Sequence, residues 1–134
     1  MAIANSNSAL GIDIACVTDL DPHFRLVSGA RNVGNALARW LQTPRGSVWY
    51  APDRGFDLLQ FANCDVDQSL IFRCRAGVIA EAKKDPRVLS VDVKVSWDET
   101  AETLTVTIRG KTAYGTFDLI ASVKDVVSIF LKAA

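Results

Sequence analysis

The chain has 134 residues, a formal net charge of zero and 49% hydrophobic residues. This length fits one domain that buries a core without disulfides. The balanced charge argues against a dedicated nucleic-acid binder, and no apolar run approaches the ~20 residues of a membrane span. Residues 1–10 lack a basic segment followed by a long apolar one, so we expect no secretory signal peptide.

Residues 1–27 predict an extended N-terminal arm with little core of its own. Within it, Ile12 to Val17 alternates briefly and predicts a short strand, and Pro22 follows a turn-like segment. Such an arm lies along its own domain or along a neighbouring molecule, and the sequence leaves both possibilities open.

A first helix is predicted over Gly29–Gln42, with Ser28 as its N-cap. The segment from Thr43 to Gly46 ends it, and Ser47–Tyr50 has strand character. Phe56 to Phe61 predicts one or two helical turns. The apolar stripe of the first helix is formed by Val33, Leu37, Trp40 and Leu41.

The stretch from Asp65 to Ile108 predicts a second helix followed by a hairpin. Asp65 is the expected N-cap, with Gln68 at the capping-box spacing. The helix should end at about Lys84, because Pro86 removes a backbone donor and restricts the residue before it. Its stripe consists of Val66, Leu70, Cys74 and Val78, with Ile71 beside them.

Apolar and polar residues alternate over 88–97 and 103–110, which predicts two strands with one solvated face. A second turn is expected over Gly110–Gly115, and a third strand alternates from Phe117 to Val123. Val126 to Leu131 is apolar almost throughout, which fits a buried strand, an edge strand that needs a partner, or a short closing helix.

These elements together predict an α/β (α+β) fold with two layers in one domain. A mostly antiparallel or mixed sheet of about four strands should carry two main helices on one face. Residues 1–27 form the arm and residues 28–134 form the core.

Residues that could carry chemistry are few. His23 is the only histidine and lies in the arm, so neither a Ser-His-Asp triad nor a metal site is expected. The glutamates are Glu81, Glu99 and Glu102, and the last two fall in a predicted exposed turn. No glycine-rich phosphate loop is present. We therefore predict no catalytic, metal or cofactor site.

The remaining candidate groups have plain structural explanations. The acidic pairs Asp53 with Asp57 and Asp65 with Asp67 fit solvated turn and cap residues better than a shielded catalytic pair. The three cysteines have no metal-type spacing, and free buried thiols of a reducing cytosol are expected. They are Cys16, Cys64 and Cys74.

An ordered set of motifs over most of the chain, roughly Asp13 to Val123, resembles the contractile-tail baseplate wedge family. Phage members of that family act as sheath initiators, and the type VI secretion wedge subunit once labelled "lysozyme-like" is a relative. Two positions depart from the family pattern. Asp85 stands where the family has Glu in a Glu-Pro-Arg triplet, and Asp53-Arg54-Gly55 stands where it has Asp-Phe-Gly or Asp-Tyr-Gly. The motifs are Leu26-Val27-Ser28-Gly29, Thr43-Pro44-Arg45-Gly46, Pro52 to Leu58, Asp85-Pro86-Arg87-Val88 and Leu104 to Ile108.

The resemblance implies a structural subunit without enzymatic activity, present in six copies per baseplate between the wedge core and the first sheath ring. Its expected partners are wedge scaffold proteins, the tail sheath protein, and tube or hub proteins. Neither nucleic acid nor membrane is expected as a partner. The implied location is the virion tail baseplate, assembled in the host cytoplasm.

Two surfaces are the predicted partner contacts. The first is Asp85, Pro86 and Arg87, where the alternative is a plain helix stop with a solvated arginine. The second is the C-terminal strand, expected to bind the sheath by strand addition, and formed by Val126, Val127, Ile129, Phe130 and Leu131. Two other functions remain open: a generic adaptor that binds a peptide at its sheet edge, and a peptidoglycan hydrolase.

Overall fold

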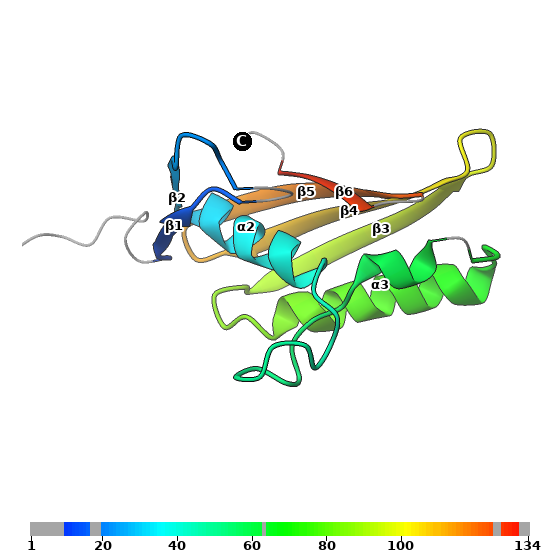
Figure 1. Cartoon of the computed structure of the whole chain (residues 1–134), viewed down its shortest axis with the longest axis horizontal. Coiled ribbons are helices and arrows are strands. Elements are labelled where there is room, and N and C mark those ends of the chain that lie inside the picture. Colours follow the sequence, from blue (N-terminus) through cyan, green and yellow to red (C-terminus); the bar gives the residue numbers. More distant parts are fainter. Residues whose placement is uncertain (1–9, 17–19, 63, 125–126, 132–134) are drawn as a thin grey trace, which may run out of the picture.

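The structure, a computed structural model, describes residues 10–16, 20–62, 64–124 and 127–131. Its centre is a four-stranded sheet with the order β3-β4-β5-β6, in which every neighbouring pair is antiparallel. Two α-helices pack side by side on one face of it (Figure 1). The predicted two-layer α+β class is confirmed, with a purely antiparallel sheet. The main elements are α2 (Ala30–Trp40), α3 (Gln68–Lys83), β3 (Ser90–Asp98), β4 (Thr103–Thr112), β5 (Gly115–Val123) and β6 (Val127–Leu131).

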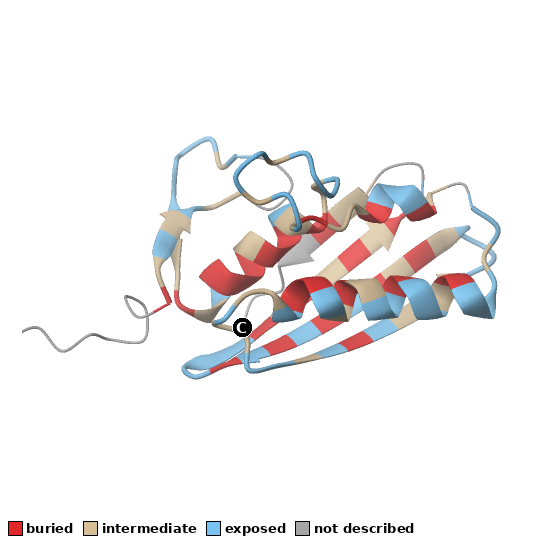
Figure 2. Cartoon of the chain, turned by 90° about the horizontal axis from the view of Figure 1, so that it is seen from below, coloured by how far each residue is buried: buried red, intermediate tan, exposed pale blue. Residues whose placement is uncertain are grey.

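Strict alternation along the strands separates a buried face from an exposed one (Figure 2). In the register, Val93 lies opposite Ile108, and Ile108 lies opposite Leu119, so one apolar row crosses three strands. All three side chains are buried beneath the helices. The opposite face carries polar residues such as Lys94 and Arg109, and no helix of the described residues covers it, as expected for a sheet with one solvated side.

Helix α3 begins two residues later than predicted. Its N-cap is Asp67, whose Oδ1 accepts a hydrogen bond of 2.7 Å from the Leu70 backbone N–H. Asp65 lies outside the helix, in the exposed approach to it. The predicted end at about Lys84 is confirmed, since Lys84 is the C-cap. The buried stripe contains Leu70, Cys74 and Val78 as expected, together with Glu81 and Ala82.

Helix α2 begins at Ala30, and its N-cap is Gly29 rather than Ser28. Ser28 is extended because it pairs with Ile12 in the arm, so it cannot cap the helix. The chain then turns from strand to helix at Gly29, with φ 69° and ψ −149°, a conformation that side chains with a Cβ rarely adopt. Val33, Leu37 and Leu41 are buried as predicted.

The predicted strand over Ser47–Tyr50 is absent, and this prediction was wrong. The segment forms consecutive turns, in which Ser47 N donates to Pro44 O, Ala51 N donates to Val48 O, and Arg54 N donates to Ala51 O. Backbone groups bonded in this way are not available to a ladder. The predicted helical turn is confirmed as the 3-10 helix η1 (Leu58–Phe61).

The turn between β4 and β5 is tighter than predicted. The two strands pair as far as Thr112 opposite Gly115, which leaves only Ala113 and Tyr114 as the loop. The hydroxyl of Thr112 closes this loop by donating to Gly115 O at 2.8 Å.

The arm lies along its own domain where the structure describes it. Strands β1 (Ile12–Ile14) and β2 (Leu26–Ser28) pair as a small antiparallel sheet beside the start of α2 (Figure 1). The predicted short strand is therefore confirmed over Ile12–Ile14, whereas Val17 lies outside the described residues. Leu10 is 5% exposed and joins the core.

Candidate functional site

Arg87 is folded onto its own chain. Its Nε and Nη2 donate to the carboxylate of Asp85, at 2.9 Å to Oδ1 and 2.6 Å to Oδ2. Its third donor, Nη1, reaches the carbonyl oxygen of Leu10 in the arm at 2.9 Å. Pro86 sits between the two partners, so the planar guanidinium fork is held by a short rigid turn.

The charges of this pair stabilise one another. Partial burial of Asp85 acts to raise its pKa, but hydrogen bonds from the Arg87 side chain and backbone, with the charge of Arg87, outweigh it and leave the pKa below its ordinary value. The hydrogen bonds with Asp85 correspondingly raise the pKa of Arg87. Both groups are therefore ionised at neutral pH.

Helix α2 holds the same arm from the other side. Asn35, which is fully buried, accepts a hydrogen bond from Cys16 N at 3.0 Å and donates to Ile14 O at 3.3 Å. Its amide thus binds an extended backbone much as a neighbouring strand would. Asn32 Nδ2 donates to Leu10 O at 3.2 Å, and Arg39 Nη2 donates to Asp13 Oδ2 at 2.7 Å.

Four side chains from two distant segments therefore converge on the arm, and we call them the arm clasp: Asn32, Asn35, Arg39 and Arg87. Sequence reasoning missed the two asparagines. The available signal was their spacing, because residues three and seven positions apart share one helical face, and two amides on the buried side of a helix need partners. Asn32 Oδ1 is buried without a hydrogen-bond partner among the described residues.

The predicted docking site at Asp85, Pro86 and Arg87 thus has a visible role inside the chain. Asp85 binds the Arg87 side chain, but Arg87 points to the arm, and its side chain is only 31% exposed. Pro86 is exposed at the surface of this turn. A partner that approaches here meets Pro86 and the rim of the clasp.

The predicted C-terminal strand exists as β6 and lies at the edge of the sheet. It pairs with β5 from Val127 opposite Val123 to Leu131 opposite Leu119. Ile129 is 2% exposed beneath α2, and Val127 packs against the core. Val127 and Ser128 are both half-buried, and of these three residues only Ile129 is fully buried. Val126 lies outside the described residues, as do the side chains of Phe130 and Leu131.

The two edge strands of the sheet, β3 and β6, differ in how their outward backbone groups are engaged. At the β3 edge, Arg75 of α3 donates from Nε to the carbonyl oxygen of Val93 at 2.9 Å. Charged residues Asp92 and Lys94 flank that position on the outer face. Beyond β6, the described part of the chain contains no further strand of this sheet.

Glu81 has a structural role, because its carboxylate joins α3 to the loop before η1. It is fully buried, and its Oε1 accepts hydrogen bonds from Gly55 N at 2.9 Å and Arg54 Nε at 3.2 Å. Its Oε2 lies 3.0 Å from Lys84 Nζ, an ion pair without hydrogen-bond alignment. Arg54 in turn stacks over the Trp40 ring, with its guanidinium carbon 4.6 Å from the centroid. The carboxylate fixes the loop before η1 to α3.

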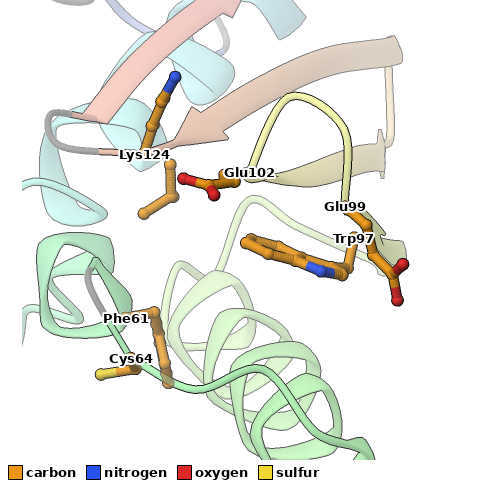
Figure 3. A pocket seen from close by; sticks show the side chains of 7 residues that line it. Phe61, Cys64, Trp97, Glu99, Glu102 and Lys124 are labelled. Atoms are coloured by element: carbon orange, nitrogen blue, oxygen red, sulfur yellow. The ribbon is translucent and has the colours of Figure 1, made fainter.

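Glu99 and Glu102 are exposed and line a cavity of about 340 Å³ at the β3–β4 turn (Figure 3). We call this cavity the hairpin-tip pocket. Neither carboxylate has the apolar shielding that a general acid requires. The predicted cap roles hold for Asp57 and Asp67, each of which accepts a backbone N–H. The full lining is Phe61, Cys64, Trp97, Glu99, Glu102, Val123 and Lys124.

The cysteines are free thiols in three different settings. Cys74 is buried, and its burial raises the thiol pKa to about 11. Cys16 is half-buried and Cys64 is exposed, so the expectation of burial holds for Cys74 alone. Within the described ranges, no group of three His, Cys, Asp or Glu side chains is arranged to hold a metal ion. No helix in the same ranges is long and apolar enough to cross a membrane.

Comparison with known proteins leaves the family open. No protein-family model matches the chain, and no curated protein matches it significantly. The resemblance to the baseplate wedge family therefore stays a prediction based on the ordered motifs.

Proposed function

We propose that this chain is a structural subunit of a contractile-tail baseplate, which bridges the wedge core and the first sheath ring and initiates sheath assembly. The observation that supports this most directly is the position of β6. An antiparallel sheet with a C-terminal edge strand and one solvated face offers backbone groups to a strand from another protein. A sheath initiator needs such a template.

The helices favour the β6 edge over the β3 edge as the template. Helix α2 lies under β5 and β6 and holds Ile129 in the core, so β6 is supported from below. The β3 edge is engaged by Arg75. A guest strand on β6 would take its register from backbone pairing and its specificity from alternate side chains.

The experiment is deletion of residues 126–134 in the phage or injection system that encodes the chain. We expect the truncated protein to fold and enter the baseplate, while sheath polymerisation fails to start. Electron microscopy of tail particles distinguishes baseplates with and without sheath. If the truncated chain unfolds in circular dichroism, β6 is ordinary core and strand addition is wrong.

The same geometry fits a second candidate, an adaptor that binds a peptide at β6 in another assembly. Electron microscopy of native tails with an antibody against the chain separates the two. Label at six positions around the baseplate supports the baseplate subunit. Absence of label from intact tails, together with capture of a soluble strand peptide, supports the adaptor.

We propose no enzymatic activity. Glu81 serves the loop before η1, and Glu99 and Glu102 are open to solvent. Purified protein should leave peptidoglycan suspensions turbid. Clearing that is lost in Glu102→Gln but kept in Asp92→Asn would show a hydrolase.

A further inference from the structure

The molecule separates charge along its longest axis although its net charge is zero. The β1–β2 sheet of the arm lies at one end, and the β3–β4 turn and the start of α3 lie at the other (Figure 1). The second end carries five exposed carboxylates against the single lysine of the hairpin-tip pocket, Lys124. These carboxylates are Asp65, Asp67, Asp98, Glu99 and Glu102.

The hairpin-tip pocket at the acidic end has a mixed lining, in which two aromatic side chains stand beside two carboxylates and a lysine. Phe61 and Trp97 lie on different sides of it, and Glu102 and Lys124 belong to its lining as well (Figure 3). Its volume of about 340 Å³ is large enough for one aromatic side chain. An aromatic side chain flanked by a cation would match both the rings and the carboxylates.

The arm carries an exposed aromatic side chain, Phe24, at the opposite end of the molecule. Phe24 is 62% exposed and sits at the apex of a tight turn with φ 53°, in the left-handed region that favours glycine. Asp21 fixes the turn by accepting from Arg25 N at 2.8 Å and from Arg25 Nε at 3.1 Å, while Phe24 N donates to Asp21 O. The turn thus holds an exposed aromatic ring in a fixed position, where it can bind another molecule with little further loss of conformational entropy.

Two arginines lie near Phe24. The Arg25 side chain is 77% exposed, but it forms an ion pair with Asp21, in which Nη2 lies 3.1 Å from Oδ1, so Arg31 supplies the positive charge that is not already paired. Arg31 faces a hollow of about 420 Å³ beside Arg25 and Leu26. No ion pair with Arg31 is found in the part of the chain that the structure describes.

We infer that copies of this chain associate head to tail, with Phe24 of one copy seated in the hairpin-tip pocket of the next and Arg31 facing Glu99 and Glu102. The two surfaces lie at opposite ends, so Phe24 cannot reach the hairpin-tip pocket of its own molecule. A heterologous contact of this kind repeats, and it closes into a ring when its rotation permits. The inference stands independently of the proposed baseplate role.

Cys64 makes the contact directly testable, because it is exposed in the wall of the pocket. In a Cys16→Ser background, Phe24→Cys should form a disulfide between copies under mild oxidation, seen as ladders on non-reducing gels. Cysteine at position 24 meets the same backbone strain as phenylalanine, so the fold is retained. Cys64→Ser must abolish the ladder.

Tyr50→Cys in the same background is the matched control. Tyr50 is also an exposed aromatic residue, at 71%, but it lies on the loop before η1. Ladders from position 24 that form at least tenfold faster than those from position 50 support the contact. Equal rates from both positions would overturn it.

Charge reversal supplies a second measurement on the unlabelled chain. Glu102→Lys should weaken self-association in sedimentation experiments by at least tenfold, whereas Asp92→Lys on the outer sheet face should leave it unchanged. Added salt should weaken it as well. A chain that remains monomeric at all concentrations reached, with no ladder, would disprove the head-to-tail contact and leave the baseplate proposal in place.

Discussion

Arg87 Nη1 and the carbonyl oxygen of Leu10 are joined by a hydrogen bond of 2.9 Å across 77 residues of sequence. The same guanidinium is fixed by Asp85 through its other two nitrogens. One side chain thus ties the N-terminal arm to the junction between α3 and β3.

Replacing Arg87 by alanine should release the arm while the sheet and helices stay folded. The substitution removes the side-chain donors to the Asp85 carboxylate and one of the two donors to the Leu10 carbonyl, which also accepts from Asn32, and this costs about 1–3 kcal/mol. Hydrogen exchange should accelerate over residues 10–16 but not in β4. Lysine at position 87 should rescue poorly, because it lacks the planar fork. Arg109→Ala, which removes an exposed pair with Asp118, serves as the control. Unchanged exchange in the arm would contradict this role.

Acid should loosen the same connection. The pKa of Asp85 lies below its ordinary value of 3.8, so the unfolded chain binds its proton more readily than the folded chain does. Its stabilising effect is complete above about pH 4 and is lost as the pH falls through the folded pKa. The pKa of Asp13 is also lowered, mainly by its hydrogen bond with Arg39, so its contribution to stability is lost in acid as well.

The measurement for this acid effect is chemical denaturation between pH 2 and 7. The free energy of unfolding should decline below about pH 4. Asp85→Asn should be less stable at neutral pH and should show a shallower decline. If the variant and the parent have parallel pH profiles, Asp85 does not contribute in this way.

Gly77 is required by the packing of Phe56. A Cβ at position 77 would lie 2.1 Å from the Phe56 ring, so the ring must move. Gly77→Ala should destabilise the protein by about 1–3 kcal/mol through overpacking, despite the ~1 kcal/mol that alanine gains in a helix. Thermal unfolding of the double variant with Phe56→Leu should show partial rescue. Strict additivity of the two substitutions would argue against the contact.

Glu81→Gln should destabilise the fold by about 1.5–3 kcal/mol, because it removes the charge that Arg54 and Lys84 share in a buried site. Urea denaturation measures the loss. Glu102→Gln, an exposed change of the same kind, should stay within about 0.5 kcal/mol of the parent. A Glu81→Gln variant as stable as the parent would show that the loop before η1 is held by other contacts.

Regular periodicity predicted the central part of the fold. Alternation from Val91 to Trp97 and from Leu104 to Ile108 reflects burial on one face only, and this constraint is written locally in the sequence. The helix stop at Pro86 is equally local, because proline acts on its own backbone and on the residue before it.

Predictions from local sequence were wrong where a contact with another segment decides the conformation. Ser28 has a good cap side chain, but pairing with Ile12 makes it extended. Asp65 and Asp67 are equivalent by residue type, and only the actual start of α3 selects Asp67. Trp49 and Tyr50 favour strands by composition, yet the turns around them use the backbone donors that a ladder would need.

The candidate site was predictable only in part. That Asp85 braces Arg87 follows from their proximity in sequence. The third bond of Arg87 joins segments 77 residues apart, and Asn35 meets Ile14 across 21 residues, so neither contact leaves a periodic signal. The two amides on the buried face of α2 are the one local feature that points to the arm, because buried amides need hydrogen-bond partners.

The hydrogen bond from Arg75 to the Val93 carbonyl has a consequence for stoichiometry. A sheet with two open edges can add strands at both sides, so its molecules can join into a growing fibre. A sheet with one edge already engaged can bind only one further strand. Binding of a guest strand should therefore saturate at one per molecule. Concentrated protein should remain free of amyloid, and removal of Arg75 should restore a second acceptor edge and permit fibrils.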